Sequence, residues 1–170
     1  GGRVIKRDID NYRSEGGRTG LNKERYSEES ISQMRKTIAK RLSESKFSAP
    51  HFYLSISVDM EHSISSRKAI NAKLDHKISF NDIIVKACAM SLREHPIVNS
   101  SWRGDVIRRN EHVNVGVAIS VDDGLLVPVV RYTDTKTLSE ISAEVKAYAQ
   151  AAKDKKLQPA DWEGSTFTIS

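Results

Sequence analysis

The chain has a single cysteine, Cys88, and only 4 prolines among its 170 residues. One cysteine excludes an internal disulfide framework and a CxxC metal site, and it fits a reducing, intracellular compartment. No apolar run approaches the roughly 20 residues that span a bilayer, and no secretory signal precedes the first expected element. We therefore expect a soluble protein with no membrane partner and no metal site.

Acidic residues are fewer than basic ones: the chain has 22 aspartates and glutamates and 27 lysines and arginines, which gives a net charge of +5 and a pI of about 9.3. The basic excess lies mainly in the first fifty positions and around Lys153, Lys155 and Lys156. A basic chain can bind nucleic acid, but arginine and aromatic residues do not interleave here as a stacking platform. Zinc-finger and helix-turn-helix spacings are missing as well. We predict no nucleic-acid partner.

The first half of the chain changes periodicity twice. Residues 1–27 are polar and contain glycine, which is typical of a linker. Apolar residues then recur at helical spacing over 31–46, after a capping pair formed by Ser30 and Gln33. From His51 the period becomes two, which predicts a half-buried strand over 51–59. A helix is expected over 60–74, and Arg67 falls in the middle of its apolar stripe, where a buried charge needs a partner.

The second half begins with a capping box, Ser79 and Asp82, before an apolar helix that should be central and buried. Two short strands follow around Gly104, and then a long alternating strand over 113–121. Residues 122–124 predict a hairpin turn, and Pro128 in the returning strand 125–130 indicates a sheet edge or a bulge.

The last elements are an amphipathic helix and a strand. Thr137 and Glu140 cap the helix, and residues 166–170 form the strand. Because strands and helices mix without a regular βαβ repeat, the expected class is α+β, with a mainly antiparallel or mixed sheet and helices on one side.

The residue pattern alone does not identify a reaction. It contains no GxSxG, P-loop or HExxH motif and no paired carboxylates at helical spacing. Six blocks in order are nevertheless similar to the catalytic domain of the dihydrolipoamide acyltransferases of 2-oxo acid dehydrogenase complexes. These blocks cover residues 34–46, 50–55, 78–82, 99–102, 124–130 and 164–170. The His51-Phe52-Tyr53 and Ser101-Trp102 blocks resemble the pyruvate branch most.

The resemblance implies a domain organisation and a fold. Residues 1–12 resemble the tail of a peripheral-subunit-binding domain, residues 13–29 form the linker, and residues 30–170 correspond to the N-terminal part of the catalytic domain. The implied fold is an incomplete two-layer sandwich of the chloramphenicol acetyltransferase type.

The resemblance also implies an activity and partners. The activity is transfer of an acetyl group from a dihydrolipoyl arm, carried on another domain, to coenzyme A as substrate. The implied assembly is a homotrimer building a cage of about 24 or 60 subunits. It would serve pyruvate dehydrogenase and dihydrolipoamide dehydrogenase components, in a bacterial cytoplasm or a mitochondrial matrix.

The resemblance assigns Ser170 to stabilising the oxyanion of the tetrahedral intermediate. The family's general base is the histidine of an HxxxDG motif, and this motif does not occur in the 170 residues. The five histidines present lack that context, and we expect each to be a surface or strand-end residue and not the base: His51, His62, His76, His95 and His112. We therefore expect this chain alone to have little transfer activity.

Three further residues match family contacts with coenzyme A. Arg67 fits a phosphate contact, and a salt-bridged or snorkelling arginine is the equally weighted alternative. Ser79 matches as well, although helix capping alone would explain it. Ser120 stands where a relative has an acidic ligand contact, which puts its role in doubt. Cys88 lies on an apolar helix and is expected in the core.

Other readings of the whole chain stay open. A non-catalytic core homologue would keep the fold and lack the histidine, and branched-chain or succinyl transfer could replace acetyl transfer. An antibiotic-inactivating acetyltransferase of the chloramphenicol type fits poorly, because such enzymes lack the charged linker and the subunit-binding tail.

Overall fold

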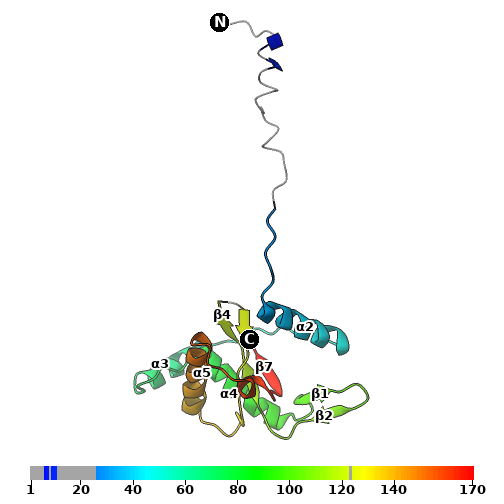
Figure 1. Cartoon of the computed structure of the whole chain (residues 1–170). Coiled ribbons are helices and arrows are strands. Elements are labelled where there is room, and N and C mark those ends of the chain that lie inside the picture. The colour runs from blue at the N-terminus through cyan, green and yellow to red at the C-terminus, as the bar shows by residue number, and fades with distance from the viewer. Residues whose placement is uncertain (1–5, 8, 11–25, 123) are drawn as a thin grey trace. The chain divides into compact units, whose positions relative to one another are not determined.

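The computed structural model describes residues 6–7, 9–10, 26–122 and 124–170. The predicted domain tail, 1–12, and the linker, 13–29, lie mostly outside these residues. The chain divides into two units, residues 1–31 and 32–170. The second unit carries the fold, and its helices and strands are drawn in Figure 1.

Helix α2, Gln33–Ser48, confirms the first predicted helix, but its cap was predicted wrongly. The N-cap is Ser32, whose Oγ accepts a hydrogen bond from the backbone N–H of Arg35, instead of Ser30. No residue of α2 is buried, and Leu42 is 65% exposed. Only Met34 and Ile38 of its apolar face are half-buried.

The strand predicted over 51–59 does not form. Residues 51–59 follow α2 as an extended segment outside any sheet, and Phe52, Leu54 and Ile56 are each more than 80% exposed. The alternating pattern is real, but a strand needs a ladder partner, and no part of the chain that the structure describes pairs with this segment.

Helix α3, Glu61–Asn71, confirms the expected helix over 60–74, and α4, Phe80–Glu94, begins at the predicted capping box. In that box Ser79 Oγ accepts from Asp82 N, and the Asp82 carboxylate accepts from Ser79 N. The helix was expected to be buried, but only one face is. Val85 is fully buried while Ile84 is 41% exposed.

Strands β1, Ser100–Trp102, and β2, Ile107–Arg109, confirm the two short strands predicted around Gly104, and they pair antiparallel as a hairpin. The long strand expected over 113–121 is divided into β3, Val115–Val117, and β4, Ile119–Val121. The returning strand is divided in the same way, into β5, Gly124–Leu126, and β6, Val129–Val130. Pro128 lies between β5 and β6, where its missing N–H costs no ladder bond, as its position indicated.

Helix α5, Leu138–Lys153, starts at the predicted Thr137–Glu140 box. A short helix that the sequence did not predict, α6, Pro159–Trp162, leads to the last strand, β7, Phe167–Ile169. Strands β6, β3 and β7 make a mixed sheet in that order, with β6 antiparallel and β7 parallel to β3.

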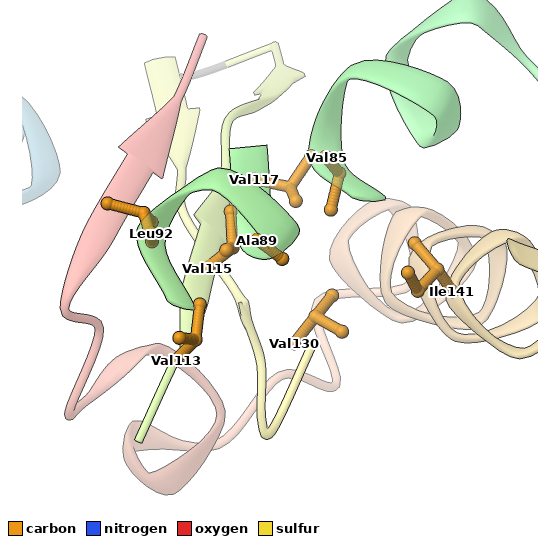
Figure 2. Packing of buried hydrophobic residues seen from close by; sticks show 8 residues of the cluster. All are labelled: Val85, Ala89, Leu92, Val113, Val115, Val117, Val130 and Ile141. Carbon is orange, nitrogen blue, oxygen red and sulfur yellow. The ribbon is translucent and has the colours of Figure 1, made fainter. Parts of the chain in front are cut away.

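The core lies between this sheet and two helices (Figure 2). Side chains of α4, β3, β6 and α5 share one buried cluster: Val85, Ala89, Leu92, Val113, Val115, Val117, Val130 and Ile141. Helices packed on a mixed sheet confirm the α+β class. The two-layer acetyltransferase description stays a prediction.

Candidate functional site

Ser170 is exposed and directly follows β7. β7 pairs in parallel with β3, so that Val117 lies opposite Ile169, and Ala118 N donates to Ile169 O at 2.8 Å. Ser170 is therefore carried past the end of β3, next to the break at Ala118 that separates β3 from β4. This register brings Ser170 toward the start of β4, the strand that contains Ser120.

The neighbouring strands approach closely at Gly116. A Cβ on Gly116 would lie 2.8 Å from Val127 Cγ1 and 3.3 Å from Thr168 Oγ1. Any larger residue would have to displace one of these neighbours. Glycine at this position therefore lets β7, and with it Ser170, lie close to β3.

Ser120 lines a pocket of about 570 Å³. Its lining combines three charged side chains, Asp122, Lys153 and Lys155, with mainly apolar ones: Met34, Val121, Leu126, Ala152, Leu157 and Trp162. Its volume lies in the range of small-molecule sites. The basic residues around Lys153 that the sequence singled out therefore contribute to the wall of a cavity.

Arg67 lies on α3, and its guanidinium makes two contacts. It donates from NH1 to the backbone oxygen of Ile78 at 3.0 Å, and it lies over the Phe80 ring, 4.1 Å from the centroid. Its Nε is buried and has no hydrogen-bond partner in the protein. The charge predicted on the apolar stripe is thus partly satisfied by a cation–π contact and one carbonyl, which leaves donors for another group.

Asn71 holds the loop between α3 and α4 beside this arginine. Its Nδ2 donates to Ile78 O at 3.0 Å, and its Oδ1 accepts from Ile78 N at 2.7 Å. Ser79 follows Ile78 directly, so the clamp brings Arg67 and Ser79 to the same loop. The sequence reading overlooked Asn71, although an amide on the apolar stripe was a visible signal.

A second pocket, of about 360 Å³, opens beside this loop. Two lysines lie with Arg67 in its wall; the lining residues are Ile64, Arg67, Lys68, Asn71, Ala72 and Lys77. Three basic side chains in one wall suit an anionic group such as a phosphate.

The four predicted residues therefore fall into two groups. Arg67 and Ser79 share the loop before α4, and Ser120 and Ser170 lie around the end of β3. No hydrogen bond or ion pair within residues 26–122 and 124–170 links one group to the other.

The remaining reactive side chains have structural surroundings. Cys88 is half-buried, and burial raises the pKa of its thiol above the ordinary 9.0, which disfavours a nucleophilic thiolate. His76 Nε2 lies 2.8 Å from Ser139 Oγ, a bond that joins the loop after α3 to the first turn of α5. Within the described ranges, no group of three or more potential ligands could hold a metal ion, and no helix is long and apolar enough to span a membrane.

Residues 23–170 match the family model described as 2-oxoacid dehydrogenases acyltransferase (catalytic domain). The chain belongs to this family.

Curated relatives agree. The chain is 45% identical over 147 residues to the dihydrolipoyllysine-residue acetyltransferase component of the mitochondrial pyruvate dehydrogenase complex of Schizosaccharomyces pombe, covering 85% of this chain and 30% of the relative. It is 40% identical to the corresponding component of Rickettsia prowazekii, covering 99% of this chain and 43% of the relative. The chain thus spans less than half the length of these relatives.

Solved structures share the fold. A probable dihydrolipoamide acetyltransferase from Listeria monocytogenes is 35% identical, with a TM-score of 0.79, and the match covers 84% of this chain and 63% of that one. The Azotobacter vinelandii dihydrolipoamide acetyltransferase is 30% identical, with a TM-score of 0.81, and the match covers 99% and 67%. The latter was studied for the role of a serine, a histidine and an asparagine in its catalytic mechanism.

Proposed function

We propose that this chain is part of an acyltransferase core that moves an acetyl group from a dihydrolipoyl thioester to coenzyme A. The family match over residues 23–170 carries the proposal, because it includes the β7 block that ends in Ser170. The pyruvate-complex names of the relatives support acetyl as the acyl group.

The chemistry is thioester exchange. A base takes the proton of the coenzyme A thiol, and the thiolate sulfur forms a bond to the acetyl carbonyl carbon. The carbonyl oxygen becomes an oxyanion, which a hydroxyl donor at Ser170 would stabilise, a role worth about 3 kcal/mol for a single donor in other enzymes. The carbon–sulfur bond to the dihydrolipoyl arm then breaks, and that sulfur takes the proton.

The 170 residues contain no HxxxDG motif, and we propose that a histidine outside them would act as the base. We assign Arg67 to a phosphate of coenzyme A, supported by its place in the wall of the 360 Å³ pocket beside Lys68 and Lys77. Ser79, at the start of α4, would add a hydroxyl near that anion. Ser120 is assigned to the wall of the pocket of about 570 Å³, through which the pantetheine arm would run.

Copies of the chain would assemble as trimers into the hollow core of a pyruvate dehydrogenase complex, with the dehydrogenase components as partners. A cubic core of such a complex is among the solved structures with this fold, with a TM-score of 0.81. The setting would be a mitochondrial matrix or a bacterial cytoplasm, since the Schizosaccharomyces pombe relative is named as mitochondrial and the Rickettsia prowazekii relative is bacterial.

The test has two parts. Acetyl transfer between dihydrolipoamide and coenzyme A, assayed with the 170-residue chain, should be near background because the base is lacking. Coenzyme A binding, measured by calorimetry, should weaken about tenfold or more in Arg67→Ala, since a guanidinium–phosphate contact is lost. The matched control is Arg93→Ala, an exposed arginine whose only described ion pair is with Asp134 at 3.9 Å.

Turnover comparable to a complete core would contradict the requirement for an outside histidine. Equal affinities for Arg67→Ala and Arg93→Ala would contradict the coenzyme A assignment. A non-catalytic core homologue is the second candidate, and it would bind dehydrogenase components without acquiring activity when the chain is joined to a base-bearing segment of an active relative.

A further inference from the structure

Asn114 is a buried amide, 4% exposed, just before β3. Its Nδ2 donates to Gly164 O at 3.1 Å, and its Oδ1 accepts from Tyr132 N at 2.9 Å. These two bonds join β3 to segments 50 and 18 positions away in the sequence. One carboxamide thus ties together the segment after β6, the entry to β7 and the start of the central strand.

The backbone of Asn114 opens the ladder between β3 and β7. Its carbonyl accepts from Thr166 N at 2.8 Å and from Phe167 N at 3.3 Å, and its own N–H donates to Thr166 Oγ1 at 3.2 Å. The pairs that follow are Val115 with Phe167 and Val117 with Ile169, and Ser170 comes next. Whatever fixes the first pair of this short ladder therefore also fixes Ser170.

The residue type matters because the two bonds need opposite chemistry. An asparagine offers both a donor for Gly164 O and an acceptor for Tyr132 N–H. An aspartate keeps the acceptor, but its charge faces the Gly164 carbonyl, and a leucine of similar shape satisfies neither group. Gly164 itself adopts φ +80, a conformation that favours glycine.

Two other contacts hold the same corner. Tyr132 adopts φ 49, which is costly for a residue with a Cβ, and the bond from its N–H to Asn114 helps to retain that turn. Arg131, its neighbour, donates from NH2 to Ala160 O and Glu163 O, both at 3.0 Å, just before Gly164.

We propose that Asn114 is a positioning residue for acyl transfer: its carboxamide sets the register of β7 on β3 and thereby the place of the Ser170 hydroxyl. A slip of one residue would turn every β7 side chain to the opposite face, so register decides where Ser170 points. The inference rests on the proposed role of Ser170, but its test does not use catalysis, so the two can fail separately.

The experiment compares amide NMR signals of Ala118, Ile169 and Ser170 in the 170-residue chain and its variants. In Asn114→Leu these signals should leave their wild-type positions, and exchange of the Ala118 amide should quicken about tenfold or more, since its bond to Ile169 depends on the register. The matched control is Asn99→Leu. Asn99 is 1% exposed and donates to the carbonyls of Asn110 and His112, which follow β2, and none of its hydrogen bonds in the described part of the chain is to the segment 164–170.

A pH profile separates positioning from general stability. In Asn114→Asp the signals should be displaced at pH 7 and return toward wild type at about pH 5, because a protonated carboxyl can donate to Gly164 O. Both asparagine variants should lower the urea midpoint, but Asn99→Leu should leave the β7 signals in place. Unmoved signals in folded Asn114→Leu, or equal displacement by Asn99→Leu, would overturn the proposal. If Asn114→Leu does not fold, the proposal would be overturned by Asn114→Asp signals that fail to return toward their wild-type positions at low pH.

Discussion

Replacing Gly116 by alanine should destabilise the domain by about 1–2 kcal/mol. The added methyl would lie 2.8 Å from Val127 Cγ1, closer than carbon atoms normally approach, and 3.3 Å from Thr168 Oγ1. Overpacking of this kind typically costs about 1–3 kcal/mol. Alanine recovers about 0.5–1 kcal/mol because the unfolded chain has less backbone freedom. A contact as short as 2.8 Å should cost in the upper part of the overpacking range, about 2–3 kcal/mol, and the difference is the net loss given above.

Urea unfolding followed by far-ultraviolet circular dichroism measures this loss. The double variant Gly116→Ala with Val127→Ala lacks the Cγ1 atom that the added methyl would contact. Its loss of stability should therefore be smaller than the sum of the losses of the two single variants, by about 1 kcal/mol. The comparison variant Gly104→Ala has open space around its Cβ but φ +78, so it reports backbone strain without a clash. An unchanged or raised midpoint in Gly116→Ala, or strict additivity with Val127→Ala, would refute the close-approach argument.

Two further predictions concern α5. Lys155 lies just beyond the C-cap of α5, Asp154, and adopts φ 56. Lys155→Gly should raise the thermal midpoint by the equivalent of about 1 kcal/mol, whereas Lys156→Gly, outside the left-handed position, should give no gain. Backbone and side-chain hydrogen bonds from Thr137 hold the pKa of Glu140 below its ordinary 4.5, so its contribution is present above pH 4.5 and is lost as the pH falls through the lowered folded value. Glu140→Gln should flatten that part of the stability profile in acid-titration circular dichroism, and an unchanged acid slope would count against the capping role.

The sequence predicted best those elements that their own residues determine. The boxes at Ser79–Asp82 and Thr137–Glu140 form as expected, because each uses bonds between residues only three positions apart. The first cap shifted from Ser30 to Ser32, an error of the size that helix ends commonly show. The α6 helix, only one turn long, gave no periodic signal.

Strands were predicted less well, because ladder partners come from distant residues. Residues 51–59 alternate correctly yet remain unpaired, with Val58 66% exposed. The division at Ala118 follows from pairing as well: β3 pairs with β6 and β7, while β4 pairs only with β5. The alternation of bulky and small residues over 113–121 does not indicate where the strand changes its pairing partner.

The candidate site divides along the same line. Arg67 could be singled out from the sequence because a charge on an apolar stripe violates a local rule. In the structure its guanidinium contacts the Phe80 ring and the Ile78 carbonyl, and its buried Nε has no hydrogen-bond partner in the protein. Ser170 has no local anomaly at all. Its significance came from family resemblance, and its position comes from Asn114, fifty-six residues earlier, through a register that only the folded sheet reveals. Residues that act by contact can therefore be found from pattern violations, whereas residues that act by holding another in place need the topology first.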